Sequence, residues 1–385
     1  MKICILAFSH PYSDGRINNR EAKSLKNFGH EITIIARPIG FEMMINKQVD
    51  GLNYFTLPLR PYSRLRQLFF DPYHMFKLLL LGFQIKCDIY LCHEPQSLIV
   101  GLILARVRKV KVIYDCHEYQ PESYADHMPR GLYEITKKIL LFIEGKIVKF
   151  TDGVITVNED LGSRFNRHNN NVIVLQNYPR QNMFQSHRKH ENQKIYVDKK
   201  KTIIYVGSIN KERGIETCIK ITSKIKPLIP SIELIIIGDI SEDYKKYLEQ
   251  MTSKLSIKNE VKIMGYVPYE EVPEYLYSSN LGLLLLSPEI ERYKWSEPIK
   301  FFEYSASYLP IVVSNLNSLR NLISIARNGI VIDINDVNEA VKEIVYLLND
   351  ENLLTEMGIR GREAFDNYFC WEKIESKLLD LFPID

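Results

Sequence analysis

The chain has 385 residues, of which 45% are hydrophobic and 25% charged, and its formal net charge is +3 at pH 7. This composition is typical of a soluble globular protein, and the near balance of charge gives no global argument for a nucleic-acid partner. The length predicts two domains of ordinary size, each able to bury its own core.

The cysteines and the apolar segments of the sequence indicate the cellular compartment in which the protein is expected. The six cysteines form no disulfide framework, which favours a reducing cytoplasm, and they lie at positions 4, 87, 92, 116, 218 and 370. Residues 1–8 are too short for a secretion signal and instead predict a first strand. The apolar run 78–83 is far shorter than the roughly 18 residues that span a bilayer. We therefore expect a cytoplasmic protein.

Apolar runs of strand length alternate with amphipathic helical patterns, which favours parallel sheets with crossover helices. The strands predicted in the first half are 2–8, 31–36, 88–92, 111–114, 153–157 and 172–175. Those predicted in the second half are 202–207, 232–237, 261–264, 281–286, 311–313 and 330–332. Residues 180–201 are polar and aperiodic, which predicts a linker between two doubly wound α/β domains.

Ligands of open α/β sheets bind beyond the carboxyl ends of the strands, so the loops there are the candidate sites. The first such loop, residues 9–16, contains Asp14, Gly15 and Arg16 and leads into a predicted helix. Gly15 permits close backbone approach, and the start of the helix offers unpaired N–H groups to an anion. A G-x-G-x-x-G fingerprint is absent here, and an ordinary polar turn is the alternative.

Two similar triplets end successive predicted strands, Cys92-His93-Glu94 and Cys116-His117-Glu118. Both should lie on the same rim of the sheet. A metal site built from the Cys and His side chains is one interpretation. The alternative is that the histidines make local hydrogen bonds, because neighbouring strand ends do not ensure the ligand distances of about 2.0–2.3 Å that zinc requires.

In the second half, residues 205–216 join a predicted strand to a predicted helix. Gly207 and Gly214 free the loop, and Arg213 stands just before the helix, where a guanidinium can contact a phosphate in bidentate fashion. A solvated arginine beside a turn is the alternative.

A helix is predicted between Pro298, which suits a first turn, and Pro310, which ends it before the strand 311–313. Glu303 falls at the edge of its apolar face, which comprises Ile299, Phe302, Ala306 and Leu309. A carboxylate there needs hydrogen-bond partners. Lys300 lies near the positive end of the helix, where an anion would also be favoured. An internal Lys300–Glu303 pair is the alternative.

This helix resembles the donor-binding helix of the retaining GT-B glycosyltransferases of family 4, P-x-K-x-F-E-Y-x-A-x-G-x-P. The residues in register are Pro298, Lys300, Phe302, Glu303, Tyr304, Ala306 and Pro310. The resemblance implies that Glu303 binds the ribose of a nucleotide-sugar and that Lys300 binds its diphosphate. Tyr308 replaces the usual Gly, and Trp295 replaces the Glu that usually touches the sugar, which leaves the identity of the sugar open.

Other motifs of that family recur in order along the chain. Asp14, Arg16, Arg20 and Glu21 resemble its opening segment, and Tyr114-Asp-Cys-His-Glu118 resembles Y-D-x-H-E, whose His contacts the donor sugar. The resemblance thereby assigns His117 to the reaction centre. In the pattern G-R-x…K-G, Ser208 replaces the first cation and Arg213 the second. Tyr266 and Val267 follow Gly265, where the family holds the nucleobase.

The resemblance therefore implies three sets of site residues. The catalytic set is His117, Arg213 and Lys300. The donor-binding set is Asp14, Gly15, Gly207, Ser208, Arg213, Tyr266, Val267, Ile299, Lys300 and Glu303. The acceptor-binding set is His93 and Arg16. No metal ligand is assigned, because a D-x-D motif is absent, and no cofactor is expected.

The resulting hypothesis is a retaining, metal-independent hexosyl- or N-acetylhexosaminyltransferase of the GT-B fold, with two Rossmann-like domains facing across a cleft. It would move a sugar from a UDP-sugar to a hydroxyl of a glycan or lipid-linked saccharide in surface polysaccharide biosynthesis. The expected domains are 1–184, acceptor-side, with a returning helix at 366–385, and 195–365, which binds the donor. The alternatives are a nucleotide-sugar epimerase of the same fold and an inactive sugar-nucleotide-binding partner subunit.

Basic and apolar residues interleave at two places in the first half. Residues 60–77 are one, and residues 137–149, with Lys137, Lys138, Lys146 and Lys149, are the other. This pattern suits the headgroup boundary of an anionic membrane, which predicts a peripheral protein on the cytoplasmic face. The alternative is that the apolar residues pack against the sheet while the cations are solvated.

Overall fold

The computed structural model describes residues 1–38, 46–58, 64–126, 128–185 and 200–384. The chain divides into two compact units, one formed by Met1–Asn177 with Ile374–Asp385 and the other by Tyr178–Lys373. The boundaries expected from the sequence, 184 and 366, lie seven residues after Asn177 and eight residues before Ile374. The final segment 374–385 belongs to the first unit, so the chain ends in the domain where it begins.

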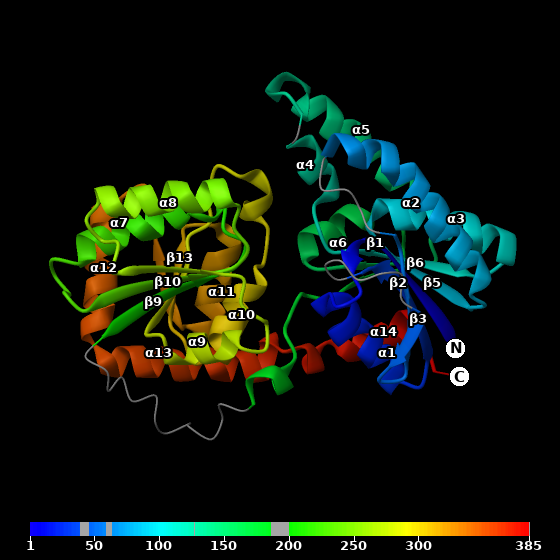
Figure 1. Cartoon of the computed structure of the whole chain (residues 1–385). Helices are drawn as coiled ribbons and strands as arrows, with labels where there is room; N and C mark the ends of the chain where they lie inside the picture. The colour runs from blue at the N-terminus through cyan, green and yellow to red at the C-terminus, as the bar shows by residue number, and fades with distance from the viewer. Residues whose placement is uncertain (39–45, 59–63, 127, 186–199, 385) are drawn as a thin grey trace. The chain divides into compact units, whose positions relative to one another are not determined.

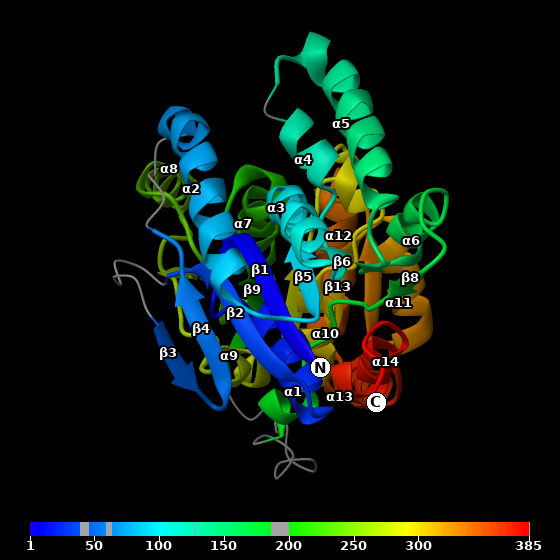
Figure 2. The ribbon, with the colours of Figure 1, turned by 90° about the vertical axis from the view of Figure 1, so that its right-hand side faces the viewer.

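The sheet of the first unit has the strand order β3-β4-β2-β1-β5-β6-β7-β8 and is parallel except for the β3–β4 pair (Figure 2). The strands are β1 (Lys2–Pro11), β2 (Glu31–Arg37), β3 (Asn46–Val49), β4 (Leu52–Thr56), β5 (Ile89–His93), β6 (Lys111–Cys116), β7 (Gly153–Thr156) and β8 (Val172–Val174). β1 pairs with both β2 and β5, so the strand order reverses at β1. Ligands of such sheets bind at this point of reversal.

The β3–β4 hairpin is the part of this sheet that was not predicted. It turns at Asp50 and Gly51, both with positive φ, as a two-residue hairpin turn requires. The Asp-Gly pair was a usable signal. The polar residues 46–49, largely exposed in the structure, have no apolar alternation that would reveal a strand.

Helices cover both faces of the first sheet. They are η1 (Gly15–Ala22), α1 (Lys23–Asn27), α2 (Arg64–Gln84), α3 (Glu94–Arg108), α4 (Gln120–Ala125), η2 (Arg130–Leu132), α5 (Tyr133–Val148) and α6 (Glu159–Phe165). The terminal pieces η9 (Glu375–Lys377) and α14 (Leu378–Leu381) pack on the same unit, where Phe382 is fully buried. Figures 1 and 2 both show α5 reaching beyond the sheet, with α4 beside it.

The second unit has a sheet in the order β11-β10-β9-β12-β13-β14, in which all neighbouring strands are parallel (Figure 1). Its strands are β9 (Lys201–Val206), β10 (Ile232–Ile237), β11 (Val261–Gly265), β12 (Leu281–Leu284), β13 (Ile311–Ser314) and β14 (Gly329–Ile332). Relative to β9 as the first strand, this is the 3-2-1-4-5-6 order of a Rossmann fold. All twelve predicted strands are present, six in each unit.

The helices of the second unit include the crossovers between its strands and further helices before the first strand and after the last. They are η3 (Gln181–Phe184), η5 (Lys211–Arg213), α7 (Ile215–Ile225), α8 (Glu242–Lys254), α9 (Val272–Ser278), η6 (Glu291–Lys294), α10 (Ile299–Ala306), α11 (Asn317–Ala326), α12 (Val337–Asn349), α13 (Glu351–Ala364), η7 (Phe365–Phe369) and η8 (Trp371–Lys373). A core rich in isoleucine and leucine lies between α7, α12 and the sheet. This core fixes the strand ends from which the candidate loops emerge.

The helix predicted between Pro298 and Pro310 is α10, and the prediction is confirmed. Phe302, Ala306 and Leu309 are buried, as its apolar face predicted. Tyr308, which departs from the family pattern, has φ +56°. Glycine adopts this left-handed backbone without a steric penalty, whereas tyrosine pays one of about 1–2 kcal/mol. The helix thus ends in the left-handed conformation that a glycine would adopt, although tyrosine stands at this position.

Candidate functional site

In the first unit, ionisable side chains gather at the carboxyl ends of β1, β5 and β6, next to the reversal of strand order. In strand register, Ala7 lies beside His93 and His93 beside Asp115. The cluster consists of His10, Asp14, Arg16, Glu21, His93, Glu94, Asp115 and His117. The two predicted histidines are therefore brought together, on the same rim.

Asp115 is the centre of this cluster and is fully buried. Its carboxylate accepts two hydrogen bonds from Arg16, from Nε at 2.7 Å and from Nη2 at 3.1 Å. Its Oδ2 also lies 3.2 Å from Nδ1 of His93 and 3.6 Å from Nδ1 of His117. Burial raises the pKa of Asp115, but the charge of the Arg16 guanidinium beside it holds the pKa well below its usual range. Asp115 therefore stays ionised.

The two predicted acceptor-binding residues lie inside the protein. Arg16 is buried, and besides Asp115 it contacts Glu21 and donates to the carbonyl of Leu175. His93 is also buried, with its Nε2 3.3 Å from Oε2 of Glu21. Both side chains order Asp115 in this structure. Their contact with an acceptor stays a prediction.

Glu21 and His93 form a buried acid–base pair beneath Asp115. Burial and the charge of Asp115 raise the pKa of Glu21 to about 7. Burial lowers the pKa of His93, but the charges of Glu21 and Asp115 outweigh it and raise the pKa to about 10. His93 is therefore a cation at neutral pH, where with Arg16 it faces the ionised Asp115 and a partly protonated Glu21.

His117, the residue predicted to orient the donor sugar, lies at the upper edge of the cluster with 8% of its side chain exposed. Its Nε2 is 3.2 Å from Nε2 of His10. His10 in turn contacts Asp14 and Glu94, both at 3.2 Å. The sequence reasoning did not assign a role to His10, whose contacts arise only when the ends of β1, β5 and β6 meet.

Asp14 and Gly15 were predicted to contribute to donor binding at the first helix start. The Asp14 carboxylate accepts from the backbone N–H groups of Arg16 at 2.8 Å and Ile17 at 3.1 Å, so it already caps η1. A Cβ at Gly15 would have only Arg20 Nη2 nearby, at 4.0 Å. The backbone at Gly15 is thus approachable, whereas the first N–H groups of η1 have an internal partner.

Of the Cys and His side chains suggested as a metal set, the two histidines come together but the two cysteines do not join them. Cys92 and Cys116 belong to the buried hydrophobic core, and the Cys116 thiol donates to the carbonyl of Glu118. Among the described residues, His93, Asp115 and His117 have candidate ligand atoms within 4.8 Å of one another. The Arg16 guanidinium already lies 2.7 Å from Asp115, so a metal ion would have to compete with it for this carboxylate. Metal independence stays a prediction.

In the second unit, Glu303 and Lys300 lie on α10 at the carboxyl end of the sheet. Glu303 is 1% exposed, and its carboxylate accepts from Lys300 Nζ at 2.8 Å and from the Tyr269 hydroxyl. The internal Lys300–Glu303 pair is thus formed. Lys300 remains partly exposed, at 21% of its side chain. A ligand would have to exchange with these contacts, and the binding role of both residues stays a prediction.

Glycines shape the neighbouring loops of the second unit. Gly207 ends β9 and Gly238 ends β10, with φ near +146° and +147°. A Cβ on Gly238 would lie 1.8 Å from the Gly207 carbonyl oxygen. The Gly207 N–H donates to Ile237 O at 2.9 Å, and the Gly238 N–H donates to Gly265 O at 2.8 Å. Three loops are therefore joined through their backbones at the carboxyl rim.

Arg213, the predicted cation of the first loop, lies over the Tyr293 ring at 4.9 Å from its centroid. Its Nε is buried and has no hydrogen-bond partner among the described residues. A cation with an unused buried donor is suited to an incoming phosphate oxygen. Ser208 is exposed nearby in sequence, and its carbonyl accepts from the Tyr205 hydroxyl at 2.9 Å.

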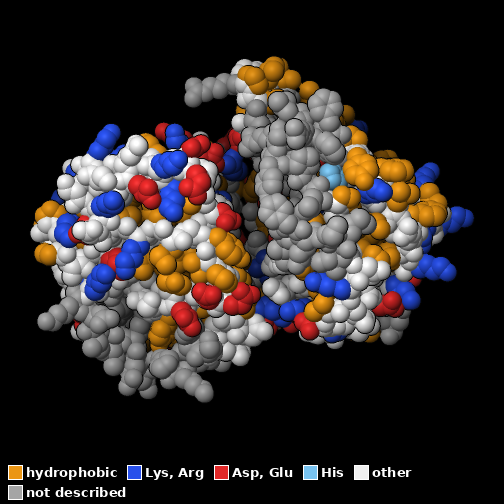
Figure 3. Space-filling model, in the orientation of Figure 1, with side chains coloured by type: hydrophobic (Ala, Val, Ile, Leu, Met, Phe, Trp, Pro, Cys, Tyr) orange, Lys and Arg blue, Asp and Glu red, His pale blue; other side chains and the backbone are white. Residues whose placement is uncertain are grey.

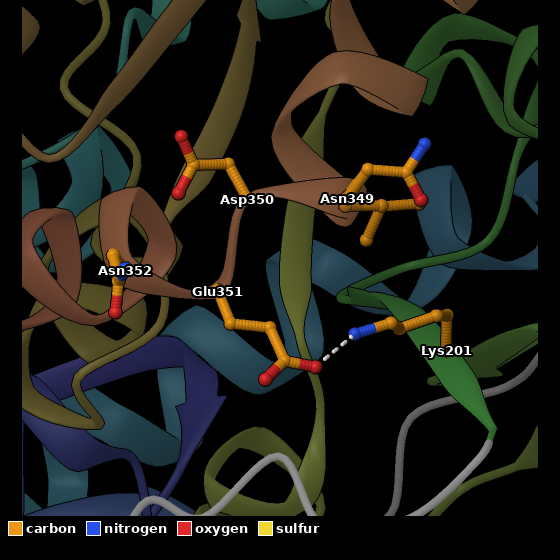
Figure 4. Close-up of a pocket in the computed structure, with 6 residues that line it drawn as sticks. Lys201, Asn349, Asp350, Glu351 and Asn352 are labelled. Carbon is orange, nitrogen blue, oxygen red and sulfur yellow. Dashed lines mark hydrogen bonds and ion pairs between the residues drawn. The ribbon is translucent and has the colours of Figure 1, made fainter.

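The remaining predicted donor residues also lie near strand ends of this unit. Tyr266 follows β11 and is 71% exposed, whereas Val267 and Ile299 are half-buried. A separate hollow, lined by Lys201 and residues 348–352, lies at the opposite end of β9, where Lys201 pairs with Glu351 at 2.8 Å (Figure 4). It contains none of the predicted site residues.

Together the two doubly wound units and their strand-end loops define a protein of the GT-B class. The sequence matches Glycosyltransferase Family 4 over residues 16–177 and Glycosyl transferases group 1 over residues 186–364. The chain belongs to the group 1 glycosyltransferases of the GT-B fold.

Two curated relatives span most of the chain. The chain is 21% identical to an N-acetyl-alpha-D-glucosaminyl L-malate synthase of Bacillus anthracis, covering 98% of this chain and 95% of the relative. It is 23% identical to the capsular polysaccharide biosynthesis glycosyltransferase CapM of Staphylococcus aureus, covering 86% of each.

Solved structures confirm the fold. A sucrose-phosphate synthase from Thermosynechococcus elongatus has a TM-score of 0.78 at 16% identity, covering 99% of this chain and 98% of that one. Anabaena HepE in complex with UDP-glucose has a TM-score of 0.70 at 16% identity and covers 99% of each.

Proposed function

We propose that this protein is a retaining glycosyltransferase that moves a hexosyl or N-acetylhexosaminyl group from a UDP-sugar to a hydroxyl of a saccharide acceptor. The observation that carries the proposal is the pairing of Glu303 with Lys300 on α10, at the carboxyl end of a Rossmann-ordered sheet. A buried carboxylate with two replaceable partners can exchange them for ribose hydroxyls. The amine thereby released can turn to the diphosphate.

The chemistry of the leaving group follows from charge. Negative charge on the diphosphate grows as the bond to the sugar breaks, so cations that meet it lower the barrier. Lys300 and Arg213 are the cations proposed for this role, and Arg213 has an unused buried Nε. His117 is proposed to orient the donor sugar. The leaving phosphate would accept the acceptor's proton, so a same-face transfer needs neither a protein nucleophile nor a metal.

UDP is proposed as the nucleotide because Anabaena HepE, which shares the fold, was solved with UDP-glucose. A saccharide acceptor in surface polysaccharide synthesis is proposed because CapM is a capsular polysaccharide glycosyltransferase. The alternatives from the sequence make different predictions. An epimerase would convert a UDP-sugar without an acceptor, and an inactive partner subunit would bind UDP without transfer or hydrolysis.

An anionic membrane surface is proposed as the place where the acceptor is met. Residues 60–63 of the first basic segment lie outside the described residues. The membrane-facing surface proposed here is therefore that of α5. One face of α5 and its flanks exposes large apolar side chains, between 45% and 73% each, namely Leu132, Ile135, Ile139, Phe142, Ile143 and Phe150. The predicted alternative of packing against the sheet does not apply to these residues.

Lysines accompany this apolar face of α5. Lys138, Lys146 and Lys149 are exposed, and Lys146 stands over the Phe142 ring at 5.2 Å. Figure 3 shows hydrophobic side chains gathered at the end of the first unit where Figure 1 places α5. Apolar side chains with flanking cations suit an anionic headgroup layer. None of the helices among the described residues is long and apolar enough to cross a bilayer.

The function is tested by incubating the full chain with a panel of nucleotide-sugars and following slow hydrolysis. We expect hydrolysis of one UDP-sugar, with release of UDP and retention of the anomeric configuration when a saccharide acceptor is added. Inversion of configuration would contradict the retaining mechanism. Binding of UDP without any turnover across the panel would support the inactive partner subunit instead.

A further inference from the structure

The pair His10 and His117 constrains where protons lie at the rim of the first unit. Their Nε2 atoms are 3.2 Å apart, and their ring centroids are 4.9 Å apart at an interplanar angle of 54°. An imidazole nitrogen carries either a hydrogen or a lone pair. At this distance one Nε2 donates and the other accepts, so a single proton lies between the two rings.

The outer contacts of His10 decide which ring donates. Its Nδ1 lies 3.2 Å from Oδ2 of Asp14, and its Nε2 lies 3.2 Å from Oε1 of Glu94 as well as facing His117. A carboxylate can only accept, so Nδ1 carries the hydrogen that bonds to Asp14, and the nearby Glu94 carboxylate favours a second hydrogen on Nε2, which is directed to His117. Burial raises the pKa of Asp14, but the hydrogen bond and charge of His10 hold it below its usual range. His10 is therefore an imidazolium.

The contacts of His117 are those of a neutral ring. Its Nδ1 faces Oδ2 of Asp115 at 3.6 Å, where a negative charge favours a hydrogen on Nδ1. Its Nε2 then presents a lone pair, which accepts from Nε2 of His10. A second proton on His117 would set two N–H groups against each other. The tautomers thus follow from the partners of each ring.

Glu94, the second counter-ion of His10, is held rigidly at the start of α3. It is 3% exposed, and its carboxylate accepts from the N–H groups of Phe8 at 3.0 Å and Ser9 at 3.1 Å. Its backbone has φ +65°, a left-handed conformation that costs a non-glycine residue on the order of 1–3 kcal/mol. Strain of this kind persists only where the surroundings fix the residue, so the contact with His10 is built into the fold.

We propose that His10 is a positioning residue for the transfer reaction. As an imidazolium between Asp14 and Glu94, it donates to Nε2 of His117 and keeps His117 in the neutral Nδ1–H form. A substrate hydroxyl then takes the place of His10 at this Nε2 and donates to it. The proposal rests on the proposed function, which places His117 at the donor sugar. It adds a residue and a proton arrangement that the family motifs do not name.

The proposal has a defined dependence on pH. The groups facing His10 are Asp14, Glu94, His117 and, through its charge, His93. Burial lowers the pKa of His10, but the hydrogen bond to Asp14 and the charge of Glu94 outweigh it and raise the pKa above 6.5. The imidazolium therefore persists to higher pH than in a free histidine, and above the pKa of His10 His117 no longer has a fixed donor at Nε2.

Nitrogen NMR of the full chain with ¹⁵N-labelled histidine tests this directly, without a ligand. At pH 7 we expect both nitrogens of His10 to be protonated and His117 to carry its hydrogen on Nδ1. Spectra of His10→Gln and His117→Gln assign the two rings. The His10→Gln amide can still donate to His117, so His117 should keep its tautomer, whereas in His10→Leu it should become a mixture of tautomers.

Two results would overturn the proposal. One is a His10 ring with a single protonated nitrogen at pH 7 in the wild type. The other is a His117 tautomer that is unchanged in His10→Leu. If His10→Leu does not fold, the wild-type and His10→Gln spectra still decide. Because these spectra need no donor, a failed proposal is distinguishable from a failed function, which would show as the expected spectra without turnover of any UDP-sugar.

Discussion

The candidate sites of the two units both lie at the carboxyl ends of the strands. Side-chain contacts form the first site, and backbone hydrogen bonds form most of the second. In the first unit, side chains make the rim, with Asp115 bonded to Arg16 and contacted by two histidines. In the second unit, backbone makes most of it, with Gly207, Gly238 and Gly265 joined by N–H to carbonyl bonds. The first rim is therefore held by ionised side chains, whereas the second is held by backbone bonds and has Lys300 and Arg213 as its cations.

The central charged side chains of the first site are also more deeply buried than the two cations of the second. Arg16 and Asp115 have almost no exposed surface and are joined by two hydrogen bonds. Lys300 and Arg213 keep partial exposure, and Arg213 has an unused donor. Charges that already satisfy each other serve to fix geometry, and charges with spare donors are available to a substrate.

The largest effect is expected from removing the available cations of the second unit. Arg213→Ala and Lys300→Ala should each lower kcat by about 100-fold, the usual cost of losing one group that stabilises transition-state charge. Affinity for the uncharged acceptor should change much less. Steady-state kinetics with the identified UDP-sugar provide the measurement. EDTA should leave activity intact, and a loss restored by zinc would instead revive the metal interpretation.

Gly238 and Gly265, at the carboxyl end of the second sheet, give a matched pair of substitutions. Both Gly238 and Gly265 have positive φ, but a Cβ would lie 1.8 Å from the Gly207 carbonyl oxygen at Gly238 and meets nothing within 4 Å at Gly265. Gly238→Ala should destabilise the protein by about 3 kcal/mol or more. Gly265→Ala should cost about 1–2 kcal/mol, from backbone strain alone. Thermal denaturation compares them, and equal losses would mean that the loops are not packed as described.

The exposed apolar face of α5 distinguishes the surfaces of the two units. The double variant Ile139→Ser/Phe142→Ser should lower binding to anionic vesicles about tenfold or more, since each buried apolar side chain contributes about 1.5–3 kcal/mol. Tyr346→Ser, at a 63% exposed position of the second unit, is the control and should bind as the wild type does. Vesicle co-sedimentation at low and high salt is the assay. A wild type that ignores anionic vesicles at every salt concentration would argue for a soluble acceptor.

A smaller effect is expected from the buried pair of the first unit. The pKa of His93, about 10, is raised above the ordinary value of 6.5, so its stabilisation is complete below pH 6.5 and lost as the pH rises towards 10. The pKa of Glu21 is raised to about 7, so its contribution is present below pH 4.5 and lost by about pH 7. Urea midpoints should therefore fall from pH 7 to pH 9, and fall less in His93→Gln. An equal fall in both proteins would contradict this pair.

Much of the fold was predictable because buried parallel strands are continuous apolar runs, as in Ile232–Ile237. The α10 helix was predictable because two prolines bound it. The hairpin at Asp50 and Gly51 was missed because its strand 46–49 is polar. Both the successful predictions and the missed hairpin depend on the pattern of a few neighbouring residues.

The candidate site was predictable only in part. Motifs identified His117, Glu303 and Lys300, since they stand at fixed spacings from prolines and strand ends. His10 and Tyr269 were missed because their contacts join segments 107 and 34 residues apart. Burial was missed too. The sequence showed that Arg16 and His93 are polar and follow strands, but only the packing of the structure shows that both side chains are buried.

The proposed donor site at α10 carries the proposed function, and calorimetric titration of UDP tests it most directly. Glu303→Ala should weaken UDP binding by about 1.5–3 kcal/mol, the range for a hydrogen bond to a charged group, and Glu303→Asp should recover little of it. Circular dichroism would show that the fold is kept. Wild-type UDP affinity in a folded Glu303→Ala variant would contradict the assignment.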